Sequence, residues 1–398
     1  MIGGLDCTKL EWRTGSGVSR VESPTSPAIL AKDIKSATRL EGLDVNAPNA
    51  TAPSGSSIGL LADHATALVV ARTKIVAGDA MKGDDGPEGA QLSNAATAAG
   101  VTGNNSIQCG SSTCAPVKDA NTGVTVYWKI QGLTPGGTNT CVGGAAHVAE
   151  SGGSGGSGGL HRYGYVGMPA FLLFHDYGGR FGNSTGYDGT DGPSGAAVGT
   201  VSVDGYVPAD GVNGADGATG HGGAGGNGVD PDNATPATDG AVWRGWMAAS
   251  GGAGGCPGLA GAAGKGGGAS IAALLDESPV TFDASELVSG QGGGGGLGAL
   301  GSAPTLGGAA GVNPRPDLPA LNAQPGGRGG IAGVSGNGGN GPSAAIAHLG
   351  AAPILIGANK TTPGAGGAEI QERSTTAFGI TKTVAATPAG VSKAILPL

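Results

Sequence analysis

Short apolar segments recur along the chain in three groups, and each group passes into a glycine-rich stretch. The first group lies at 57–61, 67–70 and 75–78, the second at 270–275, 279–282 and 287–290, and the third at 343–347 and 353–356. Their β-branched residues, and the Asp, Gly and Pro between them, are typical of strand, turn and strand rather than helix. Because such a unit cannot bury its own apolar face, copies are expected to stack. The pattern predicts short β-hairpin units.

Between these groups, glycine recurs at every third position. The longest runs are Gly211, Gly214, Gly217, Gly220, Gly223 and Gly226; Gly252, Gly255, Gly258, Gly261, Gly264 and Gly267; and Gly327, Gly330, Gly333, Gly336 and Gly339. Three residues is the repeat of the polyproline II helix, and glycine on one edge lets another backbone approach closely. We therefore expect polyglycine-II helices packed in a bundle, each satisfying its backbone groups through its neighbours. A parallel β-solenoid is the alternative, followed by collagen or a flexible linker.

The composition is unusual for a folded chain. Of 398 residues, 85 are glycine and 24 proline, while aromatic residues make up 4%. Such a chain cannot build a conventional core around aromatic side chains, and ordering its glycines costs much backbone entropy. A dense network of backbone hydrogen bonds, within the chain or between copies, is expected to offset that cost.

Composition divides the chain into four regions. Residues 1–150 are a β-rich, cysteine-containing N-terminal region, 151–178 a Gly/Ser linker and aromatic segment, 179–367 a glycine-rich repeat bundle, and 368–398 a C-terminal strand tail. The apolar end of the tail, at 394–398, predicts an extended strand that pairs with a neighbouring subunit's sheet edge, with fraying as the alternative. The first residues lack a signal-peptide pattern, so we expect either prior removal of one or another export route.

The five cysteines show no zinc-ligand spacing. Cys109 and Cys114 flank a four-residue loop and are the disulfide candidates. Disulfides form in oxidising compartments, which favours an extracellular or cell-surface location.

Charge and motifs exclude several kinds of function. The net charge is −8 with no basic cluster, which argues against a nucleic-acid partner, and no apolar window is long enough for a transmembrane helix. We predict no catalytic, cofactor or metal site, and no enzyme. Several aspartates sit in Asp-Gly-rich segments, where a turn role is favoured over calcium binding. They are Asp188, Asp191, Asp204, Asp210, Asp216, Asp230 and Asp232.

Part of the chain resembles a known group of proteins. The stretch Gly-Gly-Ala-Gly-Gly-Cys256, then Gly-Gly-Gly-Ala-Ser-Ile271 with Leu274-Leu275 and Val280-Thr281, is similar to glycine-rich surface or secreted repeat proteins of myxobacteria and related bacteria. The segment Val203–Gly211 is similar too. The likeness covers roughly residues 150–370 and implies export, with no assigned chemistry. The expected architecture also resembles polyglycine-II bundle proteins, among them phage tail-tip adhesins and a small antifreeze protein.

These observations favour a structural subunit of an extracellular filament or cell-surface coat. It would associate with itself through backbone hydrogen bonds and β-strand pairing. An adhesin that uses a rigid polyglycine-II platform to contact surface glycans or other cells is the alternative, with the aromatic residues of 160–178 as contacts. Binding of ice or polysaccharide by a flat repetitive face is a third hypothesis.

Overall fold

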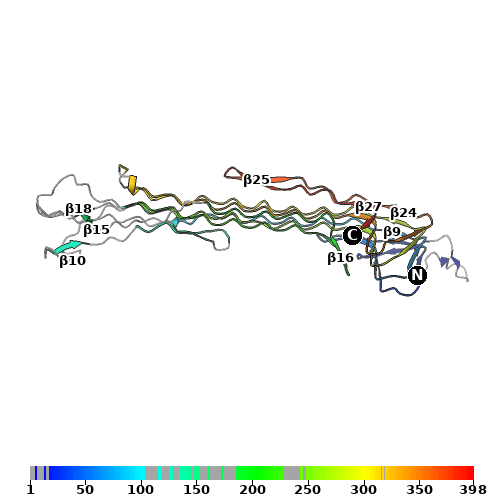
Figure 1. The fold of residues 1–398 in the computed structure, drawn as a ribbon. Coiled ribbons are helices and arrows are strands. Elements are labelled where there is room, and N and C mark those ends of the chain that lie inside the picture. Colours follow the sequence, from blue (N-terminus) through cyan, green and yellow to red (C-terminus); the bar gives the residue numbers. More distant parts are fainter. Residues whose placement is uncertain are drawn as a thin grey trace.

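The structure is a computed structural model, and it consists of a coil of parallel strands joined to a long bundle of glycine-rich segments (Figure 1). It describes residues 18–103, 134–144, 147–151, 185–227, 248–314, 316–317 and 319–398, and the strands β1 (Leu5–Asp6), β2 (Arg13–Thr14), β10 (Ala115–Lys118), β11 (Thr125–Trp128), β14 (Leu160–His161), β15 (Leu172–Leu173) and β18 (Trp243–Arg244). The helices in these residues are two short 3-10 turns, η1 (Ala96–Ala98) and η2 (Pro319–Leu321). The prediction of an all-β chain is confirmed.

Three parallel sheets form the coil, and they do not close on one another. The first has the order β27 (Ser392–Pro397), β22 (Ser343–Leu349), β19 (Ser270–Asp276), β7 (Ser57–Asp63), β4 (Ile29–Lys32). The second has the order β23 (Ile354–Ile356), β20 (Thr281–Asp283), β8 (Leu68–Ala71), β5 (Thr38–Glu41). The third has the order β24 (Lys360–Thr362), β21 (Glu286–Val288), β9 (Lys74–Val76), β6 (Leu43–Asn46), β3 (Ser19–Glu22). The parallel sheets expected for a solenoid are therefore present.

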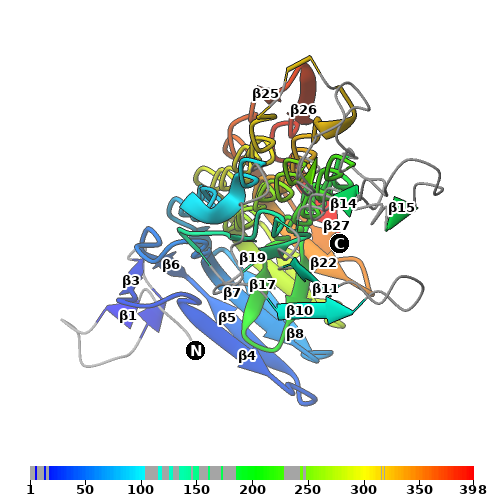
Figure 2. The ribbon, with the colours of Figure 1, turned by 90° about the vertical axis from the view of Figure 1, so that its left-hand side faces the viewer.

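The three apolar groups of the sequence are successive turns of this coil. Strands β7, β8 and β9 lie in three different sheets, and each pairs in parallel with its counterpart in the next group. The predicted hairpins within a group are therefore wrong, although the stacking of the groups is confirmed. Figure 2 shows β4, β7, β19 and β22 side by side in one sheet.

Single residues in the left-handed backbone region explain why the chain turns sideways instead of reversing. One occupies each of two corners in every turn, where a hairpin would need two central residues of special conformation. The first corner has Asp33, His64, Glu277 and Gly350, and the second has Gly42, Arg72, Ala284 and Gly357. Each corner residue thus directs the chain into the neighbouring sheet.

The coil interior is a conventional apolar core. Phe282 is fully buried, and Val70 and Leu40 lie at the same register position in β8 and β5. Leu60 and Ile346 belong to the same cluster. Burying such side chains stabilises by roughly 1.5–3 kcal/mol each, so this end of the molecule is held by side-chain packing.

The glycine-rich segments all leave the coil at its third corner. Residues 77–269, 289–342 and 363–391 run from the third sheet to the first. Buried serines mark the points of return: Ser270 Oγ donates to the carbonyl of Gly78 and accepts from the amide of Gly290. Because Ser57 and Ser343 occupy the same register position, the corner is built alike in successive turns.

The bundle extends from this corner as a long rod, with both termini at the coil end (Figure 1). Three short antiparallel strand pairs lie along the molecule: β12 (Asn139–Thr140) with β13 (Val148–Ala149), β16 (Thr200–Ser202) with β17 (Gly205–Val207), and β25 (Arg373–Ala377) with β26 (Ile380–Val384). The first sheet contains strands from three of the four regions defined by composition: β4 and β7 from residues 1–150, β19 and β22 from 179–367, and β27 from 368–398. The C-terminal strand β27 is present, and it pairs with β22 of its own chain.

Candidate functional site: the glycine bundle and the coil edge

The three long glycine runs come together as three adjacent segments. The amides of Gly211, Gly217, Gly220, Gly223 and Gly226 donate to carbonyls of 249–264, running antiparallel, with N···O distances near 2.9 Å, while the Gly214 amide donates to Ser335 Oγ. The amides of Gly252, Gly255, Gly258, Gly264 and Gly267 donate to carbonyls of 324–339, running parallel. The third segment then donates back: Gly330 to Ala218, Gly333 to Ala215, Gly336 to Val212 and Gly339 to Ala209. The predicted glycines thus form one mutually hydrogen-bonded unit.

Glycine is required in this unit because the backbones approach too closely for a side chain. A Cβ at Gly217 would overlap the carbonyl oxygen of Gly330, and a Cβ at Gly330 would overlap that of Tyr187. The other glycines of the runs 211–226 and 252–267, together with Gly333, Gly336 and Gly339, show the same overlap with an atom of another segment. The bundle interior is therefore backbone packed against backbone.

Side-chain oxygens cap the outward amides of segment 249–269. Successive amides on this side lie three residues apart, so a regular row of acceptors satisfies them. Ala260 donates to Asp216 Oδ1 at 2.7 Å, Ala263 to Asn213 Oδ1 at 2.7 Å and Gly266 to Asp210 Oδ1 at 2.9 Å. Position 257 in this row is a proline, which has no amide hydrogen. The amides of Ala260, Ala263 and Gly266 are therefore not available to a neighbouring chain.

A second row of caps repeats this arrangement on another side of the bundle. Its members lie three residues apart, except for a gap of six between Asp79 and Asp85, and each pairs with a residue 212 positions further on. Gln291 N–H donates to Asp79, Leu297 N–H to Asp85 and Leu300 N–H to Glu88, while Gln91 donates to the Ala303 carbonyl and Asn94 to the Leu306 carbonyl. Asp188 and Asp191 accept from Ile331 and Val334 in the same way. Capping is thus a general feature of the bundle surface.

The caps correct the sequence interpretation of the aspartates. Asp188, Asp191, Asp210 and Asp216 lie in extended segments rather than in turns, because their carboxylates are used by the neighbouring backbone. Asp204 does lie in the turn between β16 and β17. Asp230 and Asp232 are outside the described residues. Nowhere in the described ranges do three His, Cys, Asp or Glu side chains gather in a way that could hold a metal ion.

Neighbouring charges affect the titration of these caps. Burial works to raise the pKa of Asp210, but hydrogen bonds from Lys265 and from the Gly266 amide outweigh it and hold the pKa below its ordinary value of 3.8. The same balance, with Lys82 and the Leu297 amide as donors, lowers the pKa of Asp85. Both side chains are therefore charged acceptors at neutral pH.

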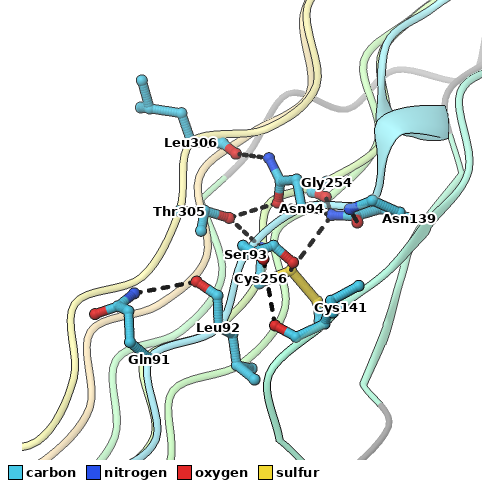
Figure 3. Close-up of a disulfide and its surroundings, with 12 residues drawn as sticks. Gln91, Leu92, Ser93, Asn94, Asn139, Cys141, Gly254, Cys256, Thr305 and Leu306 are labelled. Atoms are coloured by element: carbon cyan, nitrogen blue, oxygen red, sulfur yellow. Dashed lines mark hydrogen bonds between the residues drawn. A yellow bond between two sulfur atoms is a disulfide. The ribbon is translucent and has the colours of Figure 1, made fainter.

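A disulfide between Cys141 and Cys256 fastens the 139–149 hairpin to the bundle (Figure 3). Both cysteines are buried, and Asn139 beside them donates to the Gly254 carbonyl at 2.8 Å. The predicted pair Cys109 and Cys114 lies outside the described residues. The observed pair is separated by 115 residues, so no local spacing could reveal it. A disulfide is typical of proteins outside the reducing cytosol.

The coil has an apolar edge. In the last strand of the second sheet, β23, the side chains of Ile354, Leu355 and Ile356 are 50%, 42% and 47% exposed. Leu355 lies in register with buried Phe282, so it continues the core column to the surface. The opposite edge strand β5 instead carries an ion pair between Arg39 and Glu41 at 2.6 Å. Charged edges resist strand addition, whereas apolar ones favour it.

Comparison with protein-family models, curated protein sequences and solved structures finds no match to this chain. In the part of the chain described here, no helix is long and apolar enough to cross a membrane. The function is therefore inferred from the geometry.

Proposed function

We propose that this protein is a structural subunit of an extracellular filament or cell-surface coat, with a polyglycine-II bundle as its rigid rod. The observation that carries the proposal is the contrast between closed sides and an open end. Capping side chains satisfy outward amides along the bundle, whereas the coil presents an apolar edge strand. A subunit of this design associates through its end and remains a single rod elsewhere.

The period-three hydrogen bonds support the polyglycine-II assignment. Backbone amides three residues apart in one segment donate to the same neighbouring segment. This is the pattern expected of parallel and antiparallel threefold helices packed side by side. Such packing satisfies the backbone without an apolar core. The resulting rod resists bending because every segment is tied to several others.

Self-association is assigned to β23. Its three exposed apolar side chains occupy an edge strand, where backbone groups are available to a further strand. A second copy gains both apolar burial and ladder hydrogen bonds there. The disulfide and the capped bundle suit a protein that must stay ordered in an oxidising environment outside the cell.

The test is light scattering after size exclusion, with negative-stain electron microscopy, on the wild type and on a double variant, Ile354→Lys with Ile356→Lys. We expect oligomers or filaments of the wild type at micromolar concentration and single rods of the variant. Leu306→Lys is the matched control, because Leu306 is an exposed apolar residue on the bundle. A wild type that stays monomeric would rule the proposal out.

An adhesin is the second candidate, favoured by the position of the strands furthest from the termini. Strands β10, β15 and β18 lie at the opposite end of the rod from the coil (Figure 1). A rod anchored at the coil would hold that end away from the surface. Apart from β14 and β15, the aromatic segment 160–178 lies outside the described residues. Binding of the whole protein to a glycan array, without filaments, would favour this function.

A further inference from the structure

One side of the bundle has a groove, hereafter the side groove. It has a volume of about 370 Å³, and its floor is the segment 259–262. Residues 87–90 form one wall, Asn213 and Asp216 form the other, and His147 stands at one end. The groove therefore runs along a bundle segment between two others.

A segment of this chain already occupies the continuation of the side groove. Beyond His147, Glu150 lies over the same segment and its carbonyl accepts from the Gly254 amide at 2.9 Å. Gly254 belongs to the same three-residue row as Ala260 and Ala263. Where the segment with Glu150 lies over the row, the amide donates to a backbone carbonyl. In the groove, the amides of the row donate to the side chains of Asp216 and Asn213 instead.

In the groove, the capping side chains thus provide the acceptors that the backbone of a further chain would otherwise provide. An extended segment in the groove would need the amides that Asp216 and Asn213 now occupy, and one that continued along the same row would also need the Gly266 amide, which Asp210 occupies. An incoming segment would therefore have to displace side-chain oxygens that are already hydrogen-bonded to these amides. Glu88 adds a further negative charge to the wall, and the net charge of −8 makes another copy a repelled partner.

We propose that the side groove is a docking position for an extended, glycine-rich segment of a second copy, held shut by Asp210, Asn213 and Asp216. The three side chains are an autoinhibitory contact that prevents rods from merging along their sides. The occupant is a glycine-rich segment because the two bundle segments that flank the groove, 81–90 and 211–226, both hydrogen-bond to 249–269 at three-residue intervals. The inference rests on the proposed structural role and specifies where association is blocked.

The experiment removes the caps in the Ile354→Lys, Ile356→Lys background, so that association through the coil edge does not contribute. The test variant adds Asp210→Ala, Asn213→Ala and Asp216→Ala. The matched control adds Asp210→Asn and Asp216→Asn, which remove charge but keep an oxygen acceptor, as Asn213 does naturally. Light scattering measures mass, electron microscopy measures rod width, and a fluorescein-labelled peptide of residues 207–226 serves as the docking probe.

We expect the alanine variant to at least double in mass, with wider rods, and to bind the peptide at least tenfold more tightly than the asparagine control does. A folded alanine variant that stays monomeric and binds no more peptide than the control would overturn the inference. If the triple variant fails to fold, Asp216→Ala alone releases the Ala260 amide, and the same peptide comparison decides. Because the background is edge-blocked, failure here is independent of whether the wild type forms filaments.

Discussion

The coil and the bundle are ordered by opposite means within one chain. In the coil, Phe282 and its neighbours exclude water with large side chains, and the backbone pairs in sheets. In the bundle, glycines bring the backbones themselves into contact, and hydrogen bonds between segments hold them together, with one small apolar cluster of Leu92 and Leu259 beside the disulfide. A chain with few aromatic residues can therefore fold when its large apolar side chains are concentrated at one end and its glycines lie along the rest.

The two regions depend on each other through the third corner of the coil. Buried Ser57, Ser270 and Ser343 tie the ends of the glycine segments to the sheets. At this corner the coil fixes how the glycine segments are aligned with one another. The hydrogen bonds between the segments keep the same alignment along the bundle. Variants that affect one region and not the other will show how tightly they are coupled.

The largest expected effect belongs to the coil. Phe282→Ala removes a fully buried side chain from the middle of the core and should lower the free energy of unfolding by about 3–5 kcal/mol. Chemical denaturation measures this loss. Amide exchange then shows whether the bundle glycines lose protection as well; equal loss in both regions would mean that the coil and bundle unfold as one unit.

A smaller effect is expected from one glycine of the bundle, and its neighbour provides the control. Gly296→Ala places a Cβ on the carbonyl of Asp84, whereas a Cβ at Gly294 would lie 3.9 Å from its nearest neighbour. We expect Gly296→Ala to cost about 1–3 kcal/mol by overpacking and Gly294→Ala to be nearly neutral, as judged by thermal unfolding. Equal stabilities would show that close backbone approach is not what selects glycine here.

The smallest effects come from pH, and they differ in sign between the regions. The caps Asp85 and Asp210 have a lowered pKa in the folded state, so their contribution is present above the unfolded value and is lost as the pH falls through the folded one, below about pH 4. In the coil, the hydrogen bond to Asp63 raises the pKa of His64 above 6.5. Its contribution is therefore full below pH 6.5 and fades as the pH rises through the folded value.

Amide exchange at two pH values separates these contributions. Acidification below pH 4 should release the Leu297 and Gly266 amides, which donate to the two caps. Raising the pH from 6 to 9 should weaken the corner at His64, with no change at the caps. The variants Asp85→Asn and Asp210→Asn should abolish the acid response of the two amides; persistence of that response would show that the caps do not cause it.

Local patterns in the sequence predicted much of this structure. The apolar groups lie within a residue or two of the observed strands, and the regular glycine runs do form one packed unit. The hairpin interpretation was wrong because the partners of β7 are β4 of the preceding coil turn and β19, more than two hundred residues away, and a short apolar strand does not specify its partner. The capping role of Asp216 was missed for the same reason: the amide that it accepts belongs to a segment 44 residues further along.

The caps and glycines share a single repeat, and this has a consequence for how such a protein can change its size. If three residues were inserted into each segment of the bundle, every amide would again face a carbonyl of the neighbouring segment, and every capping side chain would again face an amide. The coil, which fixes where each segment begins and ends, would be untouched. With the polyglycine-II geometry proposed above, which rises about 3.1 Å per residue, each triplet added to or removed from every segment would change the rod length by about 9 Å.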